Sequence, residues 1–313
     1  MDRTQHHATA LDGTRIGWSN AGAGKPAVVL TDGIGCAGYI WRPLEAELAR
    51  DRRVLHWHYR GHGTSDAPAD PERMTVDDSV SDLLSVLDAA RERTVVLAGH
   101  SMGVQIVLEA YRRRPERVKA LVLLFGAAGR LLDTFHDTEV ARQLFPLARE
   151  AVLRWPDVAR RIFRSVVPTE LSLRYALRFE VDGARVPRSD IERYLSDLAA
   201  IDPTLFVRLL DSAAAHDASP ILPQVRVPTL VVAGERDTFT PLRLSVRMAQ
   251  AIPGAELLVV PGGTHVGPLE QPELVNGRIR SFLEQHAPVR RPRVRAAAAP
   301  AARPRRRPGT RPR

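Results

Sequence analysis

A serine lies between two glycines directly after an apolar run, in the stretch LAGHSMGVQ at residues 97–105. A sharp turn from a strand into a helix strains the backbone at its apex and crowds the positions two before and two after. Gly99 and Gly103 occupy those two positions. The pattern predicts a turn that presents the Ser101 hydroxyl as a nucleophile, and an ordinary strand-to-helix turn is the alternative.

A serine hydroxyl is a poor nucleophile at neutral pH and needs a base, which in turn needs an acceptor for its second nitrogen. His265 follows the strand-like run ELLVVPGG, and Asp237 follows TLVVAGER. We predict that His265 is the base and Asp237 its orienting acid, in the chain order Ser, Asp, His. His100 adjoins the serine but is expected to point into the packed turn. A histidine in a surface loop is the alternative for His265.

Acyl transfer also needs two N–H donors for the developing oxyanion. The backbone of Met102, directly after the serine, is expected to supply one of them. The second is assigned to Ile34, in the loop TDGIGCAG at residues 31–38, because Gly33 and Gly35 let that backbone approach a substrate closely. A loop whose glycines only make a turn is the alternative.

The same loop has the form G-x-G-x-x-G, which occurs in dinucleotide-binding proteins. The acid expected about twenty residues further on is missing, because His56 and His58 stand at that strand end. No metal cluster is visible in the sequence either. We therefore expect no cofactor and no metal, and we interpret Cys36 in this loop as a small buried hydrophobic residue.

Short apolar runs that alternate with helical patterns predict a doubly wound, mostly parallel α/β sheet behind an N-terminal hairpin. Ligands bind beyond the carboxyl ends of such strands, where the three proposed catalytic residues stand. The expected strands lie within 26–35, 52–63, 93–101, 118–129, 228–237 and 255–265, and the expected helices within 41–50, 75–91, 102–115, 241–252 and 272–286.

About ninety residues interrupt this alternation with helical patterns alone. Because a structureless loop of that length is not expected in a compact domain, we predict an inserted helical cap. The expected organisation is a core of residues 1–129 and 221–286, a cap of residues 130–220, and a basic, disordered tail of residues 287–313.

The net charge of +9 arises in the tail, which holds ten arginines and no acid. The rest of the chain carries 35 basic and 36 acidic residues. Residues 287–313 would suit binding of nucleic acid or an anionic surface, but a solvated tail without a partner is favoured, since the tail has no aromatic residues to stack on bases.

No apolar run is long enough to span a membrane, and the N-terminus has no signal-like apolar region. We expect a cytoplasmic protein, and the sequence does not set the oligomeric state.

Residues 9–286 resemble the α/β-hydrolase fold family. GHSMG is similar to its nucleophile elbow, GERDTFTP to the segment of its acid, and GGTHVGPLEQPE to the segment of its histidine. YRGHGTSDAP resembles a loop of the branch with helical caps. The resemblance implies Ser101 as nucleophile, His265 as base, Asp237 as its acid, and Ile34 and Met102 as oxyanion donors.

Two positions depart from the family pattern. The oxyanion loop usually begins His-Gly but here begins Asp32-Gly33. A carboxylate there would disfavour an oxyanion, so we expect Asp32 to be turned away or paired with an arginine. His58 stands where the family often has an acid, which would alter how Arg60 is held.

These observations predict a serine hydrolase that acts through an acyl-enzyme on a small to medium, largely apolar carboxylic ester or lactone. A lyase or a cofactor-free perhydrolase that uses the same three residues is one alternative. A non-catalytic ligand-binding protein on the same scaffold is another, with Asp32 as the sign of a decayed oxyanion site.

Overall fold

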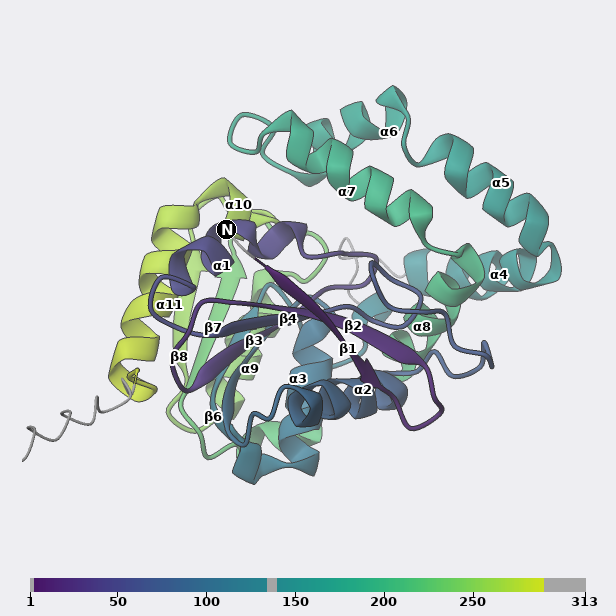
Figure 1. Cartoon of the computed structure of the whole chain (residues 1–313). Coiled ribbons are helices and arrows are strands. Elements are labelled where there is room, and N and C mark those ends of the chain that lie inside the picture. The colour runs from purple at the N-terminus through teal and green to yellow at the C-terminus, as the bar shows by residue number, and fades with distance from the viewer. Residues whose placement is uncertain (1–2, 134–139, 290–313) are drawn as a thin grey trace, which may run out of the picture.

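One eight-stranded sheet forms the centre of the computed structural model, which describes residues 3–133 and 140–289 (Figure 1). The strand order is β1-β2-β4-β3-β5-β6-β7-β8, and all pairs from β4 to β8 are parallel. The expected α/β class is confirmed. The strands are β1 (Thr4–Thr9), β2 (Arg15–Ala21), β3 (Ala27–Thr31), β4 (Val54–Trp57), β5 (Val95–His100), β6 (Val118–Leu124), β7 (Thr229–Gly234) and β8 (Glu256–Val260).

Helices cover both faces of the sheet and bury two separate hydrophobic cores. One face carries α1 (Arg42–Leu48) and α11 (Pro272–His286), and the other carries α2 (Val76–Ala89), α3 (Gly103–Arg113) and α9 (Leu242–Ala251). The central strands are therefore apolar on both faces, as buried parallel strands are. Short helical turns lie at Tyr39–Trp41, Pro115–Arg117, Leu131–Asp133, Ser219–Gln224 and α10 (Gly267–Glu270).

Between β6 and β7, the described residues form helices joined by loops, and none of them forms a strand. Figure 1 shows α4 to α7 as an arch beside the sheet. The segment contains α4 (Val140–Arg154), α5 (Pro156–Val166), α6 (Glu170–Tyr175), a π-helical turn (Ala176–Glu180), α7 (Arg188–Ala200) and α8 (Pro203–Ala215). The division into core and cap at residues 130 and 220 stays a prediction.

The end of the described chain is packed against the core. Ala287, the first residue of the expected tail, is buried, and Arg52 donates a hydrogen bond of 2.7 Å to its carbonyl oxygen. The tail from residue 290 onwards lies outside the described residues. No described helix has the length and apolar character needed to cross a bilayer.

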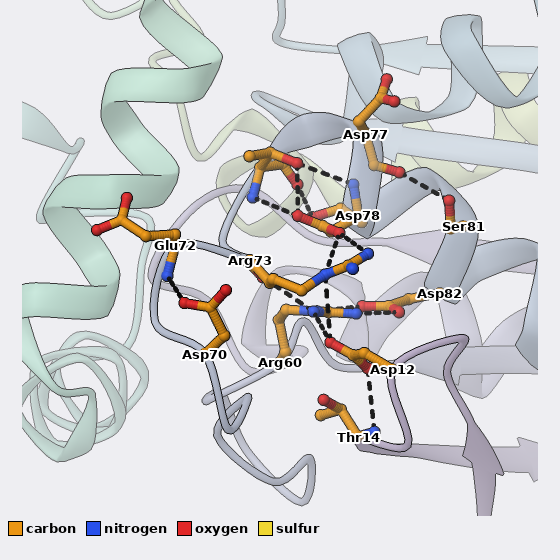
Figure 2. A network of polar contacts seen from close by, with 12 residues as sticks. Asp12, Thr14, Arg60, Asp70, Glu72, Arg73, Asp77, Asp78, Ser81 and Asp82 are labelled. Atoms are coloured by element: carbon orange, nitrogen blue, oxygen red, sulfur yellow. Dashed lines mark hydrogen bonds and ion pairs between the residues drawn. The ribbon is translucent and has the colours of Figure 1, made fainter.

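A buried arginine ties the N-terminal hairpin to α2 (Figure 2). Arg60 donates two hydrogen bonds of 2.8 and 2.7 Å to Asp82 and a third of 2.8 Å to Asp12 in the hairpin turn. It also donates to the backbone oxygen of Arg73 at 2.9 Å. Both Arg60 and Asp82 are almost fully excluded from solvent. His58 therefore does not leave Arg60 without an acid, because α2 and the hairpin supply two.

Removal of one partner from this buried cluster should be costly, because a guanidinium would keep only part of its charge compensation away from water. We expect Asp82→Ala to lower the free energy of unfolding by about 3 kcal/mol. Asp77 provides a matched control on the same helix, because its carboxylate is exposed and pairs with Arg113 at the surface. Asp77→Ala should cost less than about 1 kcal/mol. Urea denaturation measures both variants, and equal losses would contradict the assignment.

Candidate active site

Ser101 stands at the apex of a tight turn between β5 and α3. Its φ angle is 55°, in the left-handed region that non-glycine residues rarely adopt. Its backbone N–H donates to the carbonyl oxygen of Leu124 on β6 at 3.0 Å, which holds the strained residue in place. A Cβ atom on Gly99 would overlap the backbone of Gly103, and one on Gly103 would lie 2.5 Å from the carbonyl oxygen of Thr31. The two glycines are required by close backbone contact on both sides of the serine.

His265 and Asp237 come together from the ends of β8 and β7. Nδ1 of His265 lies 2.9 Å from Oδ2 and 3.1 Å from Oδ1 of Asp237, so its N–H donates to the carboxylate. The Asp237 side chain is fully buried, and the His265 side chain is 13% exposed. With Nδ1 donating to Asp237, Nε2 is the ring nitrogen left to accept a proton.

Three further donors hold the Asp237 carboxylate. The backbone N–H groups of Phe239 and Thr240 donate to Oδ1, both at 2.9 Å, and the Thr240 hydroxyl donates to Oδ2 at 2.8 Å. Burial raises the pKa of Asp237, but the charge of His265, its hydrogen bond and the Thr240 donors outweigh burial and lower the pKa overall. Asp237 is thus kept ionised and fixed in orientation.

Two aromatic rings flank His265. Phe239 stacks on its ring with the centroids 4.8 Å apart, and the His100 ring lies 4.9 Å away. Nε2 of His100 donates to the backbone oxygen of His265 at 3.0 Å, so the residue before the serine also positions the histidine loop. Ser101 and His265 line the same cavity. Within the described structure no hydrogen bond joins their side chains, as is common before a substrate tightens such a pair.

The loop after β3 runs directly beside the serine. A Cβ atom on Gly33 would lie 3.0 Å from the Cβ atom of Ser101, and Gly35 has a φ angle of 72°. No acceptor among the described residues receives the backbone N–H of Ile34 or of Met102. Two backbone N–H groups without a protein acceptor, one on each of the two segments beside the serine, are donors of the kind that hold a developing oxyanion.

Asp32 pairs with His56, not with an arginine. Oδ2 of Asp32 lies 2.8 Å from Nε2 of His56, and both side chains are at most 2% exposed. The Tyr59 hydroxyl donates to the backbone oxygen of Asp32 at 2.6 Å. Burial raises the pKa of Asp32, but the charge and hydrogen bond of His56 lower it below its usual range overall. Of the two expectations for Asp32, turned away or paired with an arginine, the arginine partner is wrong. The partner is His56, and the pair fastens the start of the loop to β4.

His58 and Cys36 lie close to this pair. Thr64 donates its backbone N–H to Nδ1 of His58 at 3.1 Å, and burial together with the charge of His56 lowers the pKa of His58 to about 3. Cys36 is buried and unbonded to another cysteine, and burial raises the pKa of its thiol. Neither residue is placed to carry charge at neutral pH.

A cavity of about 930 Å³ opens over Ser101 and is lined mainly by apolar side chains of the α4–α8 segment. Its volume is at the upper end of the range typical of small-molecule sites. Glu180 is the one carboxylate among the lining residues. The described residues contain no group of three or more side chains that could hold a metal ion. The apolar lining residues include Ile34, Leu131, Leu132, Leu144, Phe145, Val167, Leu171, Ile191, Leu195, Leu198, Phe206, Leu210, Phe239 and Val266.

The residues that hold Asp237 and the His265 loop in place were not predicted from the sequence. Thr240, three residues after Asp237, follows a spacing at which hydroxyl and backbone groups commonly bond to an aspartate. Glu270 accepts from the hydroxyl of Thr264 and from the backbone N–H of Asp182, at 2.6 and 2.8 Å. It thereby links the His265 loop to the helical segment. No pattern in the sequence signals this contact between positions 88 residues apart.

The sequence matches a known protein family and several known relatives. The family model of the alpha/beta hydrolase fold matches residues 26–272. The chain is 31% identical to polyketide synthase ThaQ of Burkholderia thailandensis over 84% of its own length, which is only 12% of that protein. It is 28% identical to RutD of Azorhizobium caulinodans, named a carbamate hydrolase, over 83% of this chain and 92% of RutD.

Solved structures agree on the fold. A hydrolase from Pseudomonas aeruginosa PA01 superposes with a TM-score of 0.71 at 25% identity, over 90% of this chain and 98% of that one. The enol-lactonase from Burkholderia xenovorans LB400 has the same TM-score at 22% identity, over 89% and 99% of the two chains.

The burial of His100 should make the protein sensitive to acid. Burial and the charge of His265 lower the pKa of His100 to about 3, while an unfolded histidine titrates near 6.5. The stabilising effect of the neutral ring is therefore complete above about pH 6.5 and is lost as the pH falls toward 3. Between pH 7 and pH 5 we expect His100→Gln to lose about 1–2 kcal/mol less free energy of unfolding than the unmodified protein. Urea denaturation at the two pH values tests this, and equal losses would refute it.

Proposed function

The chain belongs to the α/β hydrolase fold family, and on that premise we propose that it is a serine hydrolase that cleaves carboxylic esters or lactones. One observation carries the proposal. Ser101, His265 and Ile34 line one mainly apolar cavity, and the backbone N–H groups of Ile34 and of Met102, the residue after the serine, have no acceptor among the described residues. A nucleophile, a base and two oxyanion donors are the groups that acyl transfer needs.

The proposed reaction begins when Nε2 of His265 takes the hydroxyl proton of Ser101 as Oγ attacks the substrate carbonyl carbon. The carbonyl electrons move to oxygen, which accepts hydrogen bonds from Ile34 and Met102. Asp237 stabilises the imidazolium through Nδ1. The imidazolium then gives its proton to the leaving alkoxide, and an acyl-enzyme remains. Water then gives a proton to His265 and attacks the acyl carbon. The bond from that carbon to Oγ breaks, Ser101 takes the proton back from His265, and the acid is released.

The cavity favours an apolar substrate of medium size. Its lining is mainly aliphatic and aromatic, so burial of hydrocarbon would supply most of the binding free energy, at about 25 cal/mol for each Å² of apolar surface. The cavity volume of about 930 Å³ is larger than a small ester would fill. It therefore favours medium-sized esters and lactones over small ones.

The same three residues also suit reactions other than ester hydrolysis. The relation to RutD adds carbamates, whose carbonyl carbon is open to the same attack. A perhydrolase would form a peracid from the acyl-enzyme with hydrogen peroxide, so assays with and without peroxide separate that chemistry from hydrolysis. A non-catalytic binding protein on the same scaffold is the remaining alternative. The two unpaired N–H groups and the ionised Asp237 favour catalysis over it.

Three variants test the assignment with p-nitrophenyl esters of increasing chain length. Ser101→Ala and His265→Ala should each lower kcat/KM by about 10³-fold or more, since nucleophile and base act as a unit. Asp237→Ala should cost at least about tenfold less than His265→Ala, because Asp237 orients the base and transfers no proton. Ser281→Ala, an exposed serine on α11, serves as the control and should keep full activity. Retained activity in Ser101→Ala would refute the proposal.

A further inference from the structure

The helices between β6 and β7 expose an unusual amount of apolar surface. Of the twelve large apolar side chains that are strongly exposed in the described chain, nine lie between residues 140 and 175. On α4 they are Val140, Leu144 and Leu147, which are 56%, 57% and 65% exposed and recur at helical spacing. Contiguous exposed apolar surface on a folded protein marks an interaction site. We call the exposed apolar side chains of α4, α5 and α6, together with Trp155 between α4 and α5, the apolar face.

The central part of the apolar face lies on α5. Val158, Ile162 and Val166 recur every four residues and are 50–57% exposed, so they share one side of the helix. Phe163 and Val167 occupy another side and are partly buried, Val167 in the cavity wall. The helix therefore buries one apolar side against the protein and presents a second one to solvent.

Positive charge flanks the apolar face. Residues 140–166 contain six arginines and two acids, although the whole interval from 130 to 219 is nearly balanced. The guanidinium of Arg154 lies 5.7 Å from the centre of the exposed Trp155 ring. Within the described chain no acid forms an ion pair with Arg154, Arg161 or Arg164. An amphipathic helix with apolar and arginine-bearing sides suits the interface of a bilayer that contains anionic lipids.

The apolar face is continuous with the cavity over Ser101. Leu144, Leu171 and Tyr175 line the cavity and are also 57%, 79% and 55% exposed. They form an apolar rim that joins the outer surface to the cavity. A second copy of the chain or another folded protein seated on this rim would cover the cavity mouth, whereas a lipid surface would place apolar molecules at it.

We propose that α4, α5 and α6 form a docking face for a lipid bilayer that contains anionic headgroups. Trp155, Ile162 and their neighbours insert at the level of the headgroups, and Arg161 and Arg164 contact phosphates. The docking itself does not depend on catalysis. The uptake of apolar esters from the bilayer through the rim rests on the proposed hydrolase function.

Trp155 gives a direct optical readout of docking. It is 56% exposed, while the other three tryptophans, Trp18, Trp41 and Trp57, are at most 4% exposed. With vesicles of equal parts phosphatidylcholine and phosphatidylglycerol, we expect its emission to shift to shorter wavelength and to be quenched by lipids with brominated acyl chains. Trp155→Phe should abolish both changes. The arginines of residues 290–313 can attract the same vesicles, so sedimentation without a change at Trp155 would overturn the proposal.

Surface variants of the full chain separate the apolar and the electrostatic contributions. Ile162→Ser with Val166→Ser, and separately Arg161→Glu with Arg164→Glu, should each lower the vesicle partition coefficient measured by Trp155 emission at least about tenfold. Leu11→Ser is the matched control, since Leu11 is 83% exposed in the hairpin turn outside the apolar face. It should partition as the unmodified protein does.

The variants distinguish failure of the docking proposal from failure of the proposed hydrolase function. Ser101→Ala should dock normally, so loss of activity without loss of docking bears only on the proposed function. Unchanged partition of the Ile162→Ser, Val166→Ser variant would contradict the docking face. A second result would also contradict it: the unmodified protein forms a dimer in solution that this variant disrupts, and its Trp155 emission does not shift on vesicles.

Discussion

The close approach of three backbone segments around Ser101 is the constraint on which the site depends. The end of β5, the first turn of α3 and the end of β3 meet there with no room for a side chain at Gly99 or Gly103. The serine accepts a left-handed backbone conformation as a result. Such strain of about 1–3 kcal/mol persists only where the surrounding structure enforces it. Here the neighbouring strands enforce it, and they place the serine directly beside the loop after β3.

The charged groups of the site are held by neighbours that carry no reacting atoms. Asp237 has donors from Thr240 and Phe239 as well as from His265, so its ionised form persists under burial. Asp32 and His56 compensate each other behind the loop after β3. The carboxylate at position 32 is paired and anchors the loop whose Ile34 lines the cavity, which favours the proposed oxyanion role of that loop over a decayed site.

Much of this arrangement could be predicted from local patterns. Glycine spacing located the turn at Ser101, and apolar runs located the parallel strands whose ends carry Asp237 and His265. The partners of buried charges could not be predicted, because Asp82 for Arg60 and His56 for Asp32 meet only through the tertiary packing. The sequence pattern predicted that the segment containing α5 is helical. It could not show that both an inward and an outward side are apolar, since this depends on where the helix lies relative to the cavity.

The central claim is that the crowded turn presents Ser101 as a nucleophile activated by His265. Labelling with a fluorophosphonate, followed by intact-mass measurement and peptide mapping, tests it without knowledge of the natural substrate. A single adduct on Ser101 that forms far more slowly in His265→Ala is the expected result. Folded protein that takes up no label, or takes it up on another residue, would contradict the account.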